Sequence, residues 1–242
     1  MRIVRSAGLC FVAALWLGAG VAHADITYGG SWDASATPQD STPPFEFRGD
    51  AGYATLVTTG ADAPYLNINT PATFGNRPGG HFNDYTLNND PAIDLSAGGT
   101  IDFTMRVNGQ SDPADSSNGV NAFVIYAPNG SEEVYIYALW AEVGKMAGHD
   151  MDTSQWHDYR VVLGSPGDNA TLFVDGSSVA LISGGSPVGL PWNGFRFGDV
   201  SDSRSGDVDW KFIGWNPVPE PSILALLSAM GLFFLLERRK QA

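Results

Sequence analysis

The feature that most constrains the fold of this chain is strict two-residue alternation of apolar side chains, with no sustained helical period between residues 25 and 217. Ile101, Phe103, Met105 and Val107 all fall on one side of an extended chain. Such alternation predicts a half-buried antiparallel strand. Gly, Pro, Asn, Asp and Ser interrupt the apolar segments at short intervals, which is typical of a β-sandwich.

Turn residues between apolar segments predict two hairpins, one around Pro-Asn-Gly-Ser and one around Asp-Gly. The predicted hairpin strands cover residues 121–127 and 133–140, and residues 171–174 and 178–182. Three further predicted strands cover residues 157–163, 195–197 and 207–215. In the last of these, alternation places Val208, Trp210 and Phe212 on one face.

Four segments in the second half of the chain carry a resemblance. They read Trp-His-Asp-Tyr-Arg-Val-Val, Ala-Thr-Leu-Phe-Val-Asp-Gly, Phe-Arg-Phe-Gly-Asp and Gly-Asp-Val-Asp-Trp, and they start at Trp156, Ala170, Phe195 and Gly206. Their order is similar to that of concanavalin A-like jelly rolls of the laminin-G type. The positions are mostly structural, so the resemblance implies a fold more than an activity. We therefore expect an all-β chain with one concanavalin A-like jelly-roll β-sandwich over residues 25–217.

The N-terminus has the features of a cleaved signal peptide over residues 1–24. Arg2 and Arg5 precede an apolar segment, and Ala22 and Ala24 form an Ala-x-Ala cleavage site. Cys10, the single cysteine, lies inside this segment, so the mature domain has neither a disulfide nor a thiol nucleophile.

The C-terminus, residues 218–242, combines a rigid motif, a short apolar run and a basic end. The motif is Val218, Pro219, Glu220 and Pro221, and the uncharged run of 15 residues that follows ends at Leu236. As a helix this run would extend about 22 Å, less than the ~30 Å core of a bilayer. The tail therefore predicts a short membrane helix, with its basic end left in the cytoplasm.

This tail resembles the PEP-CTERM sorting signal of Gram-negative bacteria. The resemblance implies that a membrane-embedded exosortase recognises Pro219, Glu220 and Pro221 and removes the tail. It also implies a transient inner-membrane intermediate, followed by release to the cell surface or into an exopolysaccharide matrix. The alternative is an ordinary C-terminal anchor.

The exported region is strongly acidic. Of 26 acidic residues two lie in the tail, and of 13 basic residues five lie in the two ends, which leaves 24 acidic and 8 basic residues and a charge near −16. Such a charge disfavours nucleic acid and anionic lipid as partners. It is compatible with Ca²⁺ binding or with solubility alone.

No catalytic pattern stands out, and we expect no enzyme. Sandwich glucanases carry Glu-x-Asp-x-x-Glu on one strand, which this chain lacks. Asp207 and Asp209 have the i, i+2 spacing, but both are Asp and no third acid follows them. The three mature histidines have no zinc-ligand spacing. The candidate Ca²⁺ ligands are Asp199, Asp202 and Asp207, since Ca²⁺ takes loop carboxylates and carbonyls.

Carbohydrate binding would rest on aromatic side chains, because sugar rings stack their C–H faces on Trp and Tyr. Both faces of segment 133–140 are apolar or aromatic, which predicts a strand that is covered on both sides or that lines a groove. The candidate ligand-binding residues are Tyr135, Tyr137, Trp140, Trp192 and Asn193, whereas Trp156, Trp210 and Trp215 are expected in the core. The predicted function is binding or structuring of extracellular polysaccharide. The alternatives are a glycoside hydrolase or lyase of the same fold, or a structural matrix protein without a ligand.

Overall fold

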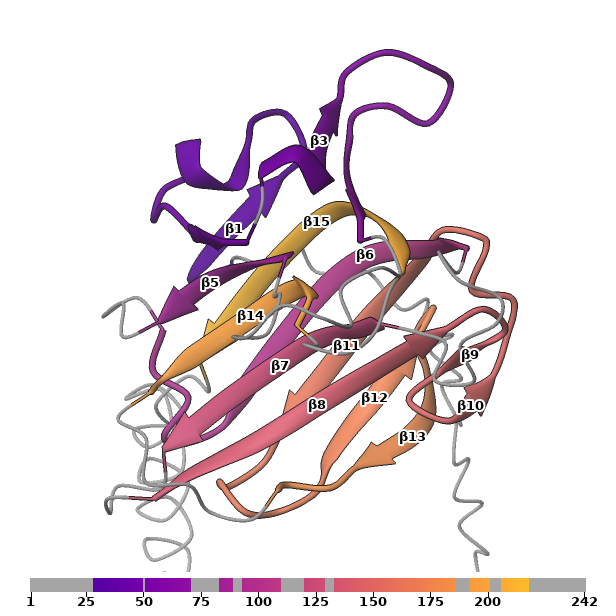
Figure 1. Ribbon diagram of the computed structural model, residues 1–242. Helices are drawn as coiled ribbons and strands as arrows, with labels where there is room; N and C mark the ends of the chain where they lie inside the picture. The colour runs from indigo at the N-terminus through magenta and orange to yellow at the C-terminus, as the bar shows by residue number, and fades with distance from the viewer. Residues whose placement is uncertain are drawn as a thin grey trace, which may run out of the picture.

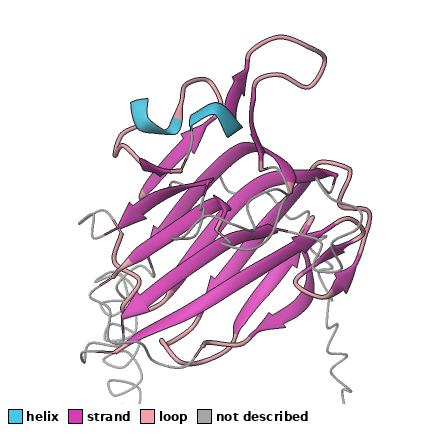
Figure 2. Cartoon of the chain, in the orientation of Figure 1, coloured by secondary structure: helices cyan, strands magenta, loops and turns pink. Residues whose placement is uncertain are grey.

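Two antiparallel β-sheets form a sandwich in the computed structural model (Figure 1). The structure describes residues 28–49, 51–70, 83–88, 93–109, 120–128, 133–185, 192–200 and 206–217. In these ranges the helical elements are two single-turn 3₁₀ helices, η1 (Pro38–Asp40) and η2 (Ala51–Tyr53) (Figure 2). No helix within the same ranges is long and apolar enough to cross a membrane. The predicted signal peptide and the C-terminal segment lie outside the described residues.

The first sheet, sheet A, has eight strands in the order β13-β12-β11-β6-β15-β4-β3, with β1 also paired to β15. Its strands are β1 (Gly30–Asp33), β3 (Ala54–Val57), β4 (Tyr65–Asn69), β6 (Gly99–Gly109), β11 (His157–Leu163), β12 (Ala170–Val174), β13 (Ser177–Ile182) and β15 (Asp207–Pro217). The two long strands β6 and β15 pair along nearly their whole length and form the centre of the sheet. Strand β13 is its outermost strand on one side.

The second sheet, sheet B, has seven strands in the order β10-β9-β8-β7-β14-β5-β2. Its strands are β2 (Glu46–Arg48), β5 (Asn83–Asn88), β7 (Val120–Pro128), β8 (Val134–Glu142), β9 (Lys145–Met146), β10 (His149–Asp150) and β14 (Gly194–Asp199). The short strand β9 pairs with β8 only at Ala141 and Glu142. Most of one side of β8 is therefore not paired within the sheet.

Aromatic rings fill the space between the sheets. The Phe123 ring on β7 lies 5.0 Å from the ring of Phe103 on β6 and 5.1 Å from that of Phe195 on β14. Trp210 and Trp215 on β15 are fully buried in the same core, as the sequence predicts. Offset and tilted contacts of this kind stabilise a core beyond the area they bury.

The predicted hairpin at Asp175 and Gly176 is confirmed between β12 and β13. Both residues have positive φ, 49° and 82°. Two successive left-handed residues give the tight turn whose twist matches that of paired strands. The Asp-Gly pair in the sequence therefore predicts this turn correctly.

One predicted face is wrong. The sequence places Phe212 with Val208 and Trp210, but the register of β15 shifts between Trp210 and Phe212. An irregularity of this kind adds a residue to one strand and reverses the side-chain alternation beyond it. Phe212 therefore packs against Tyr28, with ring centroids 5.2 Å apart, and Ile213 continues the core.

Candidate functional site

Strand β8 presents different side chains on its two faces, as predicted. Tyr137 and Leu139 are buried in the core between the sheets. Ile136 and Trp140 are half-buried and Ala138 is exposed on the opposite face. The alternation of a strand thus leaves one outward row on β8 that is apolar and partly open to solvent.

Segments from elsewhere in the chain approach the incompletely paired side of β8. The N–H of Gly185, which follows β13, donates to the carbonyl of Ile136 at 2.6 Å. The N–H of Ala147, in the turn between β9 and β10, donates to the carbonyl of Trp140 at 2.7 Å. These two bonds connect the outer strand of sheet A and the β9–β10 hairpin to β8.

Between these attachments lies an open groove of about 520 Å³. We call it the Trp140 groove, and its lining consists of Ile136, Ala138, Trp140, Ala147, Leu181, Ile182, Ser183 and Gly185. Its volume falls within the ~300–1,000 Å³ typical of small-molecule sites. The groove is mainly apolar, and no lining residue carries a charge.

The indole of Trp140 is held in position by a hydrogen bond. Its Nε1–H donates to Oε1 of Glu142 at 2.8 Å, two residues farther along the same face of β8. Because the polar edge of the indole is satisfied by the chain, a ligand in the groove meets mainly the apolar part of the ring.

Of the five predicted ligand-binding residues, Trp140 is the one that lines this groove, and the two tyrosines lie on the other face of β8. Tyr137 is 1% exposed, and its hydroxyl accepts a hydrogen bond from the N–H of Gly167 at 3.1 Å. Burial raises the pKa of this phenol. Tyr135 packs against the core on the same side of β8. Both tyrosines therefore lie on the inner face of the strand.

Trp192 precedes β14 and packs in a separate apolar cluster against sheet B. Its ring packs edge-on against Tyr126 of β7, with centroids 5.0 Å apart. Ile136 packs against the same cluster and also lines the Trp140 groove. Asn193, which follows Trp192, accepts a hydrogen bond from the N–H of Leu95 at 3.2 Å.

A buried ion pair lies beside this cluster and is not predicted by the sequence analysis. Arg196 of β14 donates from Nε and Nη2 to the two carboxylate oxygens of Asp84 on β5, each at 2.7 Å. Both side chains are at most 5% exposed. Arg196 also donates to the hydroxyl of Tyr126 at 3.3 Å. The bidentate ion pair thus joins β14 to β5, and the bond to Tyr126 links it to β7 beside the apolar cluster.

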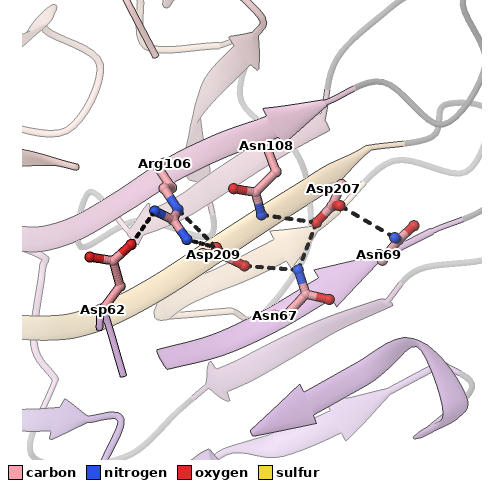
Figure 3. A network of polar contacts seen from close by, with 7 residues as sticks. All are labelled: Asp62, Asn67, Asn69, Arg106, Asn108, Asp207 and Asp209. Atoms are coloured by element: carbon pink, nitrogen blue, oxygen red, sulfur yellow. Dashed lines mark hydrogen bonds and ion pairs between the residues drawn. The ribbon is translucent and has the colours of Figure 1, made fainter. Parts of the chain in front are cut away.

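The outer face of sheet A carries a polar network across strands β4, β15 and β6 (Figure 3). Asn67 donates from Nδ2 to Asp207 at 2.6 Å and to Asp209 at 2.8 Å. Asn69 and Asn108 also donate to Asp207, at 3.3 and 3.2 Å. The three amides join three strands through one carboxylate.

Arg106 forms the other half of this network (Figure 3). Its guanidinium lies 2.8 Å from Asp62 and 2.9 Å from the buried carboxylate of Asp209. The hydrogen bond from Arg106 lowers the pKa of Asp62. The guanidinium also lies 4.6 Å from the ring centre of Trp156, and the Lys211 ammonium lies 4.1 Å from it. Trp156 is therefore occupied by two cations on the outer face and is not a core residue as expected.

The three predicted calcium ligands are not seen as one cluster. Asp199 is fully buried, and its carboxylate accepts a hydrogen bond from the Thr70 hydroxyl at 2.5 Å. Asp207 lies in the polar network, and Asp202 is outside the described residues. Among the residues that the structure describes, no group of three or more His, Cys, Asp or Glu is arranged to hold a metal ion.

The residues of the polar network leave a partial signal in the sequence. Alternating polar residues recur at Asn67 and Asn69, at Arg106 and Asn108, and at Asp207 and Asp209. Each pair lies on one face of a strand. What the sequence lacks is the order of the strands, which alone brings the three pairs together.

Comparison with solved structures supports the fold. A carbohydrate esterase from the Shiga toxin-encoding bacteriophage phi24B superposes with a TM-score of 0.51 at 15% identity, over 78% of this chain and 97% of that one. A sialidase gives a TM-score of 0.47 at 10% identity, and the match covers 81% of this chain but 19% of the sialidase. No protein-family model and no curated protein matches the sequence. At these identities the likeness to the esterase shows a shared β-sandwich fold alone, and the likeness to the sialidase carries no inference.

Proposed function

We propose that this chain is an exported protein that binds polysaccharide through a lectin-like sandwich, with the Trp140 groove as its binding site. The observation that carries the proposal is the position of Trp140, whose indole lines an open groove while its N–H is engaged by Glu142. A pyranose ring presents C–H groups on its faces and stacks on such an aromatic surface. The sandwich itself is of the concanavalin A or laminin-G type in this proposal, as the sequence resemblance implies.

Binding is better supported than cleavage. A retaining glycosidase needs two carboxyl groups about 5–5.5 Å apart, and an inverting one needs them about 6.5–9.5 Å apart. The lining of the groove contains no carboxylate, and Glu142 reaches it only through its bond to Trp140. This arrangement favours a non-enzymatic role over a glycoside hydrolase of the same fold.

The two chain ends support a surface or matrix location. The signal peptide implies export, and the motif from Val218 to Pro221 implies processing by an exosortase after a stage in the inner membrane of a Gram-negative bacterium. A net charge near −16 in the exported region suits a soluble life after release. The partners in this proposal are the processing enzyme and an extracellular polysaccharide.

A glycan array tests this proposal. Full-length protein and the variant Trp140→Ala are applied to a broad array of polysaccharides, each with and without Ca²⁺. We expect the wild-type protein to bind at least one glycan and Trp140→Ala to lose most of that signal. The proposal fails if no glycan is bound, which would favour a structural protein without a ligand, or if the variant binds as well as the wild type.

A further inference from the structure

Methyl groups cover most of the wall of the Trp140 groove. Ala138 is exposed on β8, and Leu181 of β13 is 71% exposed. Ile136 and Ile182 add further apolar surface. A ligand that covers this wall gains affinity in proportion to the apolar area that leaves water.

Ala147 contributes a methyl group at a position that favours glycine. Its φ is 49°, in the left-handed region, and the next residue, Gly148, also has a positive φ of 79°. An L-residue is disfavoured there relative to glycine, because its Cβ crowds the backbone. The methyl group of Ala147 nevertheless lines the groove, and its N–H is fixed on the carbonyl of Trp140.

Ser183 supplies the single side-chain hydroxyl of the lining. This hydroxyl forms no hydrogen bond with the described part of the chain. The nearby N–H of Gly185 already donates to Ile136. Ser183 is therefore the side-chain donor that the groove offers to a ligand.

The charges around the groove disfavour an acidic ligand. No Lys, Arg or His lines it, and the carboxylate of Glu142 is hydrogen-bonded to the Trp140 indole that does. Lys145, on the adjacent hairpin, is paired with Asp150 at 3.9 Å. Uronate or sialate carboxylates would meet like charge with no cation in the lining to offset it.

From these contacts we infer that the Trp140 groove selects neutral glycans that carry acetyl groups. The acetyl methyl packs against Ala138, Ala147 and Leu181, and the acetyl carbonyl accepts a hydrogen bond from Ser183. The inference rests on the proposed function, since it names the class of glycan that the same groove takes. One buried methyl and one hydrogen bond together raise affinity roughly tenfold.

The test compares one polysaccharide with and without its acetyl groups. Full-length protein is run on native gels that contain acetylated glucomannan, the same glucomannan after alkaline deacetylation, or polygalacturonate. Both glucomannans are neutral, so the comparison isolates the acetyl group. We expect affinity for the acetylated form to exceed that for the deacetylated form roughly tenfold, with no retardation by polygalacturonate.

Leu181→Ser provides the matching variant, with Val143→Ser as its control. Val143 is the other large exposed apolar side chain of the described residues, at 48% exposure, and it lies outside the lining. We expect Leu181→Ser to weaken binding of the acetylated form roughly fivefold while Val143→Ser leaves it unchanged. Both variants replace an exposed side chain, so the fold should be kept, and a thermal melt checks this.

The outcomes separate the two proposals. Equal retardation by both glucomannans, or a preference for polygalacturonate, overturns the acetyl selectivity and leaves glycan binding standing. Retardation by none of the three polysaccharides also overturns the selectivity. If, in addition, the protein binds no glycan on the array, the proposed function itself is overturned.

Discussion

The indole N–H of Trp140 donates to the carboxylate of Glu142 at 2.8 Å, from two residues away on the same face of β8. The bond restricts rotation of the indole in the open groove. We expect Glu142→Ala to weaken glycan binding about threefold. Without the hydrogen bond the indole rotates more freely, and it loses more conformational entropy when glycan binds. Affinity electrophoresis with the glycan identified on the array measures the change.

Glu142→Gln is the matched control, since its amide oxygen accepts the same hydrogen bond without a charge. We expect this variant to bind like the wild-type protein. Equal losses in Glu142→Ala and Glu142→Gln would instead show that the charge of Glu142 matters, and not its hold on the ring.

Arg196 and Asp84 form the most deeply buried ion pair that the structure describes, with at most 5% of either side chain exposed. Arg196→Met leaves the Asp84 carboxylate buried without its partner. We expect a loss of about 3–5 kcal/mol in the free energy of unfolding, measured by urea denaturation. Replacing both partners by apolar residues should recover much of this loss, because no charge is then left unpaired.

The exposed ion pair between Lys145 and Asp150 serves as the control for the buried pair. Its atoms are 3.9 Å apart, and both side chains are more than half exposed. Lys145→Met should change stability by less than about 1 kcal/mol. Similar losses for Arg196→Met and Lys145→Met would show that the buried pair does not support sheet B.

His157 ties the start of β11 to the β12–β13 turn. Its Nδ1 lies 2.7 Å from the Asp175 carboxylate and its Nε2 lies 2.9 Å from the carbonyl of Asp152. Burial alone would lower the pKa of His157, but the bonds to Asp175 and Asp152 and their negative charge outweigh it and raise that pKa. Burial would likewise raise the pKa of Asp175, but its bonds from His157 and the Asp158 N–H lower it.

The direction of the pH dependence follows from these shifts. Because the pKa of His157 is raised on folding, its stabilisation is complete below the unfolded value of about 6.5 and is lost as pH rises through the folded value. The stabilisation from Asp175 is lost at the acid end, as pH falls through its lowered pKa. Compared with His157→Gln, the wild-type protein should melt about 2–4 °C higher at pH 5.5, with a smaller difference at pH 8.5. A difference that grows with pH would contradict the assignment.

Local chemistry explains how much of the fold was predictable. The strands β6, β7, β8, β11 and β15 have clear alternation or turn residues at their ends, and the structure confirms them close to the predicted bounds. The short strands β1 to β3 carry too few residues for alternation to show, whereas β4 alternates clearly although it is not among the predicted strands. The face of Phe212 was predicted wrongly because a bulge in β15 depends on how two strands pair and leaves no local mark.

The candidate site was predictable only in part, for a related reason. Trp140 was selected because its strand is aromatic on both faces, and it does line a groove. Other lining residues come from Leu181 of β13 in sheet A, from Ser183 just after that strand, and from Ala147 in a turn. Nothing local in the sequence brings these segments together, because their contact depends on which strands lie at the edges of the two sheets.

The sorting proposal has a test of its own. Pro219→Ala and Glu220→Ala alter the Pro-Glu-Pro motif before the apolar run. We expect both variants to remain uncleaved in the membrane fraction, whereas Ser222→Ala, just outside the motif, is processed normally. Immunoblots of membrane and medium fractions show the result, and normal release of the two motif variants would argue for a different route.

We propose that glycan binds in the Trp140 groove and not on the polar face of sheet A. Two-dimensional NMR of ¹⁵N-labelled full-length protein, titrated with the glycan found on the array, tests this directly. We expect the amide signals of Ala138, Ala147, Leu181 and Ser183 to shift together and to saturate at one Kd. Shifts confined to Asn67, Asn69 and Asn108 on the polar face, or no shifts at saturating glycan, would contradict it.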